Sequence, residues 1–230
     1  MSRAIIIAGV AAVALAAAGV TTVGMRYPDL SARALARAAM LVNPPARPQA
    51  LLDAVRAYPD AGGVALTFAL ADARRWDVAG DSTYQVETDD ALPGLVFARV
   101  ASAKARPGAS AALGLRAFFT PDFAQRANGR RVEFGVIARS PSTHGAGALA
   151  IVYATQQAGN SGWRTFRLSR SFAAYTAVFE VPRVAEGYAK APFISIHADA
   201  LGRGREADVL AVFARILPER GPQGSDSLMR

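Results

Sequence analysis

The chain contains no cysteine. This absence excludes disulfide bonds, thiolate metal sites, iron–sulfur clusters and cysteine nucleophiles. It does not exclude export from the cytoplasm, because a chain of 230 residues has room for a hydrophobic core that needs no disulfide.

Lysine and histidine are also scarce. The only lysines are Lys104 and Lys190, so the 26 basic residues are almost all arginine, and with 18 acidic residues they give a net charge of +8. Such a charge favours acidic partners. The arginines are scattered, however, and no recognition helix, zinc finger, RNP motif or glycine-rich phosphate loop accompanies them. We therefore predict neither nucleic-acid binding nor nucleotide chemistry.

One long apolar run lies near the start of the sequence. Residues 4–25 carry no charge, and at a rise of about 1.5 Å per residue they can cross a hydrocarbon core of about 30 Å. We predict that residues 1–25 are either a transmembrane anchor or a signal peptide cleaved near Ala16-Ala17-Ala18. Because Arg3 precedes the run, the remaining chain is expected in a bacterial periplasm, tethered to the cytoplasmic membrane or released from it.

Residues 26–61 are rich in alanine, leucine and arginine, and their apolar residues recur at helical spacing. Asn43-Pro44-Pro45 ends a first predicted helix, and a second, shorter helix is expected over residues 49–57. We interpret this segment as a helical neck or linker.

From Gly62-Gly63 onward, short apolar or alternating runs are separated by Gly, Pro, Asn, Asp and Ser. This texture predicts an all-β domain over residues 62–217, a jelly-roll β-sandwich, followed by a disordered tail over residues 218–230. The eight predicted strands span residues 95–102, 111–119, 131–139, 148–156, 163–168, 174–181, 193–199 and 208–217.

Four runs of the predicted strands carry a family resemblance: GRRVEFGVIAR (129–139), GWRTF (162–166), FAAYTAVFEVP (172–182) and Ala207-Asp208-Val209. In this order they resemble the carbohydrate-binding modules of the galactose-binding-like superfamily. The resemblance implies a non-catalytic jelly roll that binds glycans on a concave face or at loop tips, often with a structural calcium ion. Asp208 matches the acid of the last strand, but no clear acidic cluster accompanies it. We therefore predict no cofactor and no metal site, and the structural calcium ion that the resemblance implies stays an alternative.

Alternation predicts one polar stripe across three strands. If Ile194 and Ile196 face the core, Ser195, His197 and Asp199 face outward together. The same rule turns polar residues of two other strands away from the core. Were the three strands neighbours, the stripe would consist of Glu133, Arg139, Glu180, His197 and Asp199. It would be either a glycan groove or a solvated face with cross-strand ion pairs.

Aromatic rings and planar amides also suit sugar binding. Trp163 follows a glycine-rich loop and is either a stacking platform or the buried tryptophan of a sandwich core. Gln156 and Asn160 beside it are candidates for amide contacts, unless they are simply solvated. Tyr153 lies in a strand that is apolar on both faces, so periodicity does not choose its side.

Motifs for catalysis are lacking. No G-x-S-x-G elbow or H-E-x-x-H sequence is present. We therefore predict a non-catalytic, carbohydrate-binding envelope protein with a role in polysaccharide synthesis or export, whose partner is a glycan. The alternative is a structural sandwich that docks an envelope protein. A third reading is an enzyme: a lyase using Tyr153, His197, Arg139 and Gln156, or a glycosidase using two of Glu133, Glu180 and Asp199.

Overall fold

The computed structural model describes residues 48, 50, 52, 53, 63–89, 95–104 and 110–219. The predicted membrane segment, most of the predicted neck and most of the predicted tail lie outside these residues. In the part of the chain that is described, no helix is both long and apolar enough to cross a membrane.

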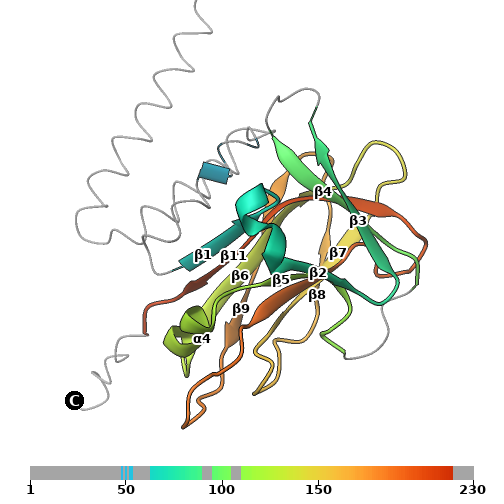
Figure 1. Ribbon diagram of the computed structural model, residues 1–230. Coiled ribbons are helices and arrows are strands. Elements are labelled where there is room, and N and C mark those ends of the chain that lie inside the picture. Colours follow the sequence, from blue (N-terminus) through green and yellow to red (C-terminus); the bar gives the residue numbers. More distant parts are fainter. Residues whose placement is uncertain are drawn as a thin grey trace, which may run out of the picture. The chain divides into compact units, whose positions relative to one another are not determined.

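Two antiparallel sheets form a sandwich, which confirms the predicted architecture (Figure 1). The first sheet has six strands. They are β3 (Ser82–Thr88), β4 (Val96–Ser102), β11 (Glu206–Ile216), β6 (Arg131–Arg139) and β9 (Ala173–Glu180) in this order, with β1 (Gly63–Thr67) also on β11. One edge of β11 pairs first with β4 and then with β1, and its other edge pairs with β6.

The second sheet has five strands. Their order is β2 (Trp76–Ala79), β5 (Gly114–Phe118), β10 (Phe193–His197), β7 (Ala148–Ala154) and β8 (Arg164–Arg167). Two short helices lie within residues 63–219, the 3-10 helix η2 (Leu70–Arg75) and the α-helix α4 (Pro121–Ala127), and residues 48, 50, 52 and 53 are helical as well. Helix α4 lies at the end of the sandwich where β6 begins (Figure 1).

Each of the eight predicted strands overlaps an observed strand, whereas β1, β2, β3 and α4 were not predicted. Strand β3 is polar at most positions and therefore shows little apolar alternation. Helix α4 has a recognisable start, because the Thr120 side chain accepts the Phe123 N–H and Pro121 follows at the first helical position.

The core lies between the two sheets. Alternate residues of each strand point into it, among them Val132, Phe134 and Val136 of β6 and Ile194 and Ile196 of β10. These side chains are fully buried. Burial of this kind, worth roughly 1.5–3 kcal/mol for each large apolar side chain, is the main stabilising term of the fold.

A buried carboxylate ties three strands together on the outer face of the six-stranded sheet. Asp208 of β11 lies opposite Arg99 of β4 and Arg139 of β6. Its two oxygens accept hydrogen bonds from Arg99 Nε (3.0 Å) and Arg139 Nε (2.8 Å). The Arg139 guanidinium is packed 4.4 Å from the ring centre of Phe172. Because a buried ion is tolerated only when it is paired, the two arginines make this position possible for an aspartate.

The same contacts change the pKa of the Arg99 side chain. Burial by itself lowers the pKa of the Arg99 guanidinium, but the neighbouring carboxylates, Asp208 foremost, raise that pKa above its ordinary value. The arginine therefore remains a cation within the sheet.

We expect Asp208→Asn to lower the free energy of unfolding by about 3 kcal/mol, the lower end of the range for removing one partner of a buried ion pair. The lower end applies because the side chains of Arg99 and Arg139 retain 30% and 25% exposure. Denaturation by urea measures the loss. The control is Glu180→Gln, which removes a 3.9 Å contact to Arg131 from a carboxylate that is 76% exposed, and should change stability by less than about 1 kcal/mol. Equal losses in both variants would contradict this account of Asp208.

Candidate functional site

The predicted polar stripe is divided between the two sheets. Glu133 and Arg139 of β6 and Glu180 of β9 lie on the outer face of the six-stranded sheet, as alternation predicted. His197 ends β10 and Asp199 follows it, in the other sheet. The prediction of one shared stripe is therefore wrong, because β10 pairs with β5 and β7 and not with β6.

The three stripe residues on the six-stranded sheet take part in ion pairs. The pairs are Glu133–Arg215 (2.6 Å), Arg139–Asp208 (2.8 Å) and Glu180–Arg131 (3.9 Å). They link neighbouring strands, which is the arrangement that the solvated-face interpretation predicted. A role of these three residues in ligand binding remains an untested prediction.

The polar face of β10 is buried, contrary to the prediction. The two isoleucines point into the core as expected, but Ser195 and His197 on the opposite face are 0% and 1% exposed. The segment that leads into β5 covers Ser195, whose hydroxyl donates to the Leu113 carbonyl. The ring of Trp163 stands edge-on to the His197 ring at 6.3 Å between centroids. His197 is thus part of the packing between the sheet and its covering segment.

Asp199 is also buried, and its carboxylate stabilises a loop. It is 5% exposed, and its carboxylate accepts backbone N–H groups from Leu201 (3.1 Å), Arg203 (2.7 Å) and Arg205 (3.4 Å). These bonds hold the loop between β10 and β11. The predicted outward position of Asp199 is therefore wrong, because the chain after β10 folds back over the carboxylate.

Tyr153 belongs to the core. It is 1% exposed and lies 5.7 Å from the Phe134 ring and 6.0 Å from the Phe179 ring. Burial, with a smaller effect from Tyr188, raises the pKa of the Tyr153 phenol. A neutral phenol among aromatic rings does not reach a ligand at the surface.

Trp163 was predicted to be either a stacking platform or the buried tryptophan of the core, and Trp76 occupies the core position instead. Trp76 is the buried tryptophan, stacked on Phe68 at 4.1 Å between ring centroids. Trp163 is half-buried on the outer face of the five-stranded sheet, and its indole N–H donates to the Ser110 carbonyl at 3.3 Å. It is therefore neither a core residue nor a freely exposed platform.

The arrangement separates the residues of the predicted lyase and pairs two of the glycosidase candidates with arginines. Of the lyase set, Tyr153 points into the core, Arg139 lies on the outer face of one sheet and His197 is buried in the other. Of the glycosidase candidates, Asp199 follows a strand of the five-stranded sheet, whereas Glu133 and Glu180 belong to the six-stranded sheet and are paired with arginines. The side chains proposed for the lyase therefore do not meet at one place. Glu133 and Glu180 are diagonal neighbours on one sheet face, but each is paired with an arginine.

The acid that matched the calcium-binding position of the family does not suit a cation. Both oxygens of Asp208 accept hydrogen bonds from guanidinium groups, and these positive charges would repel a calcium ion. Asp208 of this chain is engaged by two arginines.

An open cleft lies over the outer face of the five-stranded sheet, with a volume of about 390 Å³. Its floor comes from β5, β7 and β10, and its rim comes from the segment before β5 and the loop after β7. The lining residues are Ser110, Ala111, Ala112, Arg116, Ala154, Gln156, Gln157, Gly159, Asn160 and Phe193. Two predicted ligand residues, Gln156 and Asn160, are among them, and Trp163 borders the cleft through its bond to Ser110.

Arg116 supplies the positive charge of the cleft. Its guanidinium carbon lies 5.5 Å from the ring centre of Phe118 and 6.0 Å from that of Phe193, and one nitrogen donates to Asp77. Arg116 was not among the predicted site residues. The signal was present, because Arg116 alternates with apolar residues along β5 and so had to face away from the core.

The amides of the cleft are held in place by the backbone. Gln156 Nε2 donates to the Ala191 carbonyl, and Gln157 Oε1 accepts the Ala189 N–H at 2.7 Å. Asn160 Oδ1 accepts a backbone N–H at 2.9 Å. Gln156 has φ of 62°, an unfavourable backbone conformation for a residue with a side chain. The rim of the cleft is thus preorganised, which lowers the entropy lost on binding.

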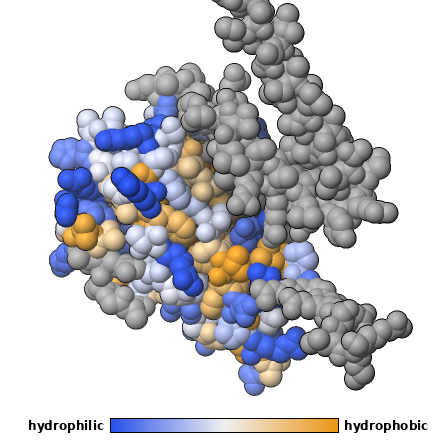
Figure 2. Space-filling model, turned by 180° about the vertical axis from the view of Figure 1, so that it is seen from behind, coloured by the Kyte–Doolittle hydropathy of each residue, from blue (hydrophilic) through white to orange (hydrophobic). Residues whose placement is uncertain are grey.

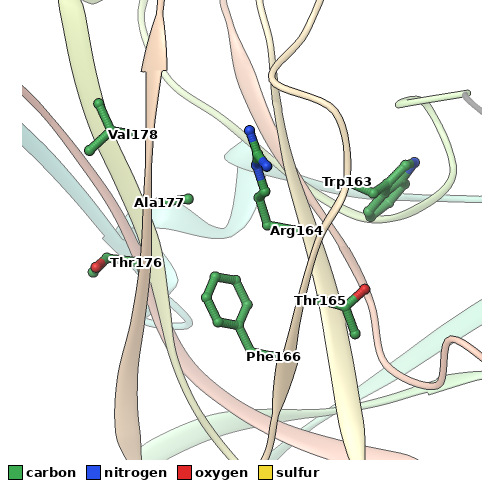
Figure 3. A pocket seen from close by; sticks show the side chains of 7 residues that line it. All are labelled: Trp163, Arg164, Thr165, Phe166, Thr176, Ala177 and Val178. Atoms are coloured by element: carbon green, nitrogen blue, oxygen red, sulfur yellow. The ribbon is translucent and has the colours of Figure 1, made fainter.

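A second hollow of about 470 Å³ lies between β8 and β9, the strands that end the two sheets on one side of the sandwich. Figure 3 shows Arg164, Phe166 and Ala177 in the gap between the two strands. Trp163 and Thr165 point to the opposite side of β8 (Figure 3).

No protein-family model and no curated protein matches the chain. Among solved structures, the chain is similar to the CBM22-1 xylan-binding domain of Paenibacillus barcinonensis Xyn10C, with a TM-score of 0.49 and 9% identity, covering 68% of this chain and 95% of that one. The xylan-binding module CBM15 has a TM-score of 0.43 and 9% identity, covering 69% and 100%. The CBM22-1–GH10 modules of Clostridium thermocellum xylanase 10B have a TM-score of 0.41 and 14% identity, covering 69% of this chain and 28% of that one.

These similar structures include the class that the sequence resemblance predicted, carbohydrate-binding modules. Their TM-scores lie below 0.5 and their identities to this chain are 9–14%, so the ligand must be argued from the side chains.

We expect Asp199→Ala to lower the free energy of unfolding by about 1.5–3 kcal/mol, because hydrogen bonds to a charged acceptor contribute about that much. Thermal or urea denaturation measures the change. The control is Glu186→Ala, an exposed acid with no ion pair among the described residues, which should leave stability unchanged. If Asp199→Ala were as stable as the control, the carboxylate would not hold the loop.

Proposed function

We propose that this protein binds carbohydrate in the cleft over the five-stranded sheet and catalyses no reaction. The observation that supports this most is the combination of Arg116, Gln156 and Asn160 at one open surface, with the half-buried ring of Phe118 beside the Arg116 guanidinium. Sugar hydroxyls bind planar amide and guanidinium groups, and the apolar faces of sugar rings pack on aromatic side chains.

The floor of the cleft supports the same conclusion. Ala154 and the alanines of the rim have short side chains, so the middle of the cleft stays open to a ligand that lies along the sheet. The polar groups lie mainly at the rim, where a chain of sugars presents its hydroxyls. In the view of Figure 2, polar and apolar side chains are interspersed over the described surface.

We expect Arg116→Ala to weaken glycan binding by about tenfold or more, since a hydrogen bond to a charged group contributes about 1.5–3 kcal/mol. Binding is measured by affinity electrophoresis and calorimetry on the neutral glycans xylan, cellulose and mixed-linkage β-glucan. The matched control is Arg126→Ala on α4, which also removes an arginine paired with an acid (Asp122) and packed on a phenylalanine ring (Phe123).

The control variant should bind like the unaltered protein. Binding to no glycan at millimolar concentration would refute the proposal, and it would favour the alternative of a sandwich that docks an envelope protein. Glycan binding that is equally weakened by Arg126→Ala and Arg116→Ala would leave the function but move the site elsewhere.

For localisation, we propose that residues 4–25 carry the chain to the bacterial cytoplasmic membrane, so that the sandwich works on its periplasmic side in polysaccharide synthesis or export. The support is the uncharged apolar run with Arg3 before it. Alkaline phosphatase fused after Arg230 should be active and a fluorescent protein that folds only in the cytoplasm should be dark. The reverse result would place the domain in the cytoplasm, and mass spectrometry of the mature N-terminus separates an anchor from a cleaved signal.

A further inference from the structure

The hollow between β8 and β9 has a chemistry different from that of the cleft. Arg164 and Phe166 are on the side of β8 that faces the interior, because they pair with Ile151 and Leu149, two core residues of β7. At the edge of the sandwich this side opens into the gap toward β9, where Ala177 faces them (Figure 3). A guanidinium group therefore lies beside an aromatic ring and a small apolar residue.

No acidic residue that the structure describes neutralises the charge of Arg164. Among the residues that the structure describes, no carboxylate lies within ion-pairing distance of Arg164, although many arginines of the domain have such a partner. The residue is exposed. An uncompensated cation at the mouth of a hollow attracts an anionic group, and a guanidinium binds a carboxylate through two parallel hydrogen bonds.

Backbone groups add hydrogen-bonding capacity to the hollow. Strand β8 pairs only with β7 and strand β9 only with β6 among the described strands. Each strand thus has one edge whose N–H and C=O groups are not used by a described neighbour. Sugar hydroxyls, which donate and accept, match such a mixed row of groups.

We infer that this hollow binds a carboxylate-bearing sugar, a uronic acid unit of an acidic polysaccharide. Its carboxylate pairs with Arg164, and the apolar face of its ring packs on Phe166. The inference rests on the proposed glycan-binding function and adds a second site and the class of sugar. Phe166 favours a uronate over a bare anion, because an aromatic ring contributes only when the ligand offers an apolar face.

The test compares Arg164→Gln with Arg167→Gln. Both variants remove one exposed arginine from the same strand, but Arg167 pairs with Ala148 on the outer face and lies outside the hollow. Binding of polygalacturonate and alginate oligosaccharides is measured at about 0.15 M salt, where long-range attraction is largely screened. Arg164→Gln should weaken binding of these oligosaccharides about tenfold or more, while Arg167→Gln should leave it nearly unchanged.

Two further measurements sharpen the test. Arg164→Lys keeps the charge but cannot form a bidentate pair with a carboxylate. Its affinity for uronate oligosaccharides should lie between those of the unaltered protein and Arg164→Gln. Poly-L-glutamate serves as a carboxylate chain without sugar rings and should bind weakly, with little dependence on Arg164.

The outcomes separate this inference from the proposed function. Equal effects of Arg164→Gln and Arg167→Gln on uronate binding overturn the inference, while neutral glycans still bind at the cleft in an Arg116-dependent manner. Arg164-dependent binding of poly-L-glutamate as tight as that of uronates overturns it in favour of an acidic peptide. Absence of binding to every glycan refutes the proposed function as well.

Discussion

Strand β11 is the element on which the arrangement of the six-stranded sheet depends. It is buried from Ala207 to Arg215 and pairs with three strands, β1, β4 and β6. A buried charge in such a strand must find partners in its neighbours. Asp208 finds them in Arg99 and Arg139, so the ion pairs specify which strands lie side by side. A register shift of one residue would turn Asp208 toward the apolar core, which makes alternative pairings costly.

In the five-stranded sheet, the segments that cover part of the outer face determine where the candidate site lies. Part of its outer face is closed by the segment before β5 and by Trp163, which bury Ser195 and His197. The remaining part stays open as the cleft, between Arg116 and the amides of the loop after β7. The same sheet face is therefore structural at one end and available to a ligand at the other, and the covering segment supplies part of the rim.

Local features of this fold could be predicted from the sequence, and pairings between distant residues could not. Strands such as β6 show alternation and lie between turn residues, so their positions and inward faces followed from the nearest residues alone. No local sequence pattern indicates that β10 pairs with β5 and not with β6. This pairing places His197 and Arg139 in different sheets. Gln156 and Asn160 were named as candidates because a loop beside an aromatic residue is a local pattern, and both line the cleft. The burial of Asp199 depends on backbone N–H groups after the strand, which side-chain patterns do not show.

The position of β11 in the chain also governs how the domain can acquire its structure. The strand that pairs with β1, β4 and β6 is the last strand described, and β1 is the first. Contacts of such large sequence separation close late and make folding slow. Until residue 216 has been synthesised, β4 and β6 lack their shared neighbour and expose unpaired backbone edges that are prone to aggregation. The six-stranded sheet can therefore close only after β11 has been synthesised, so most of the described domain must be present before its central strand can join it.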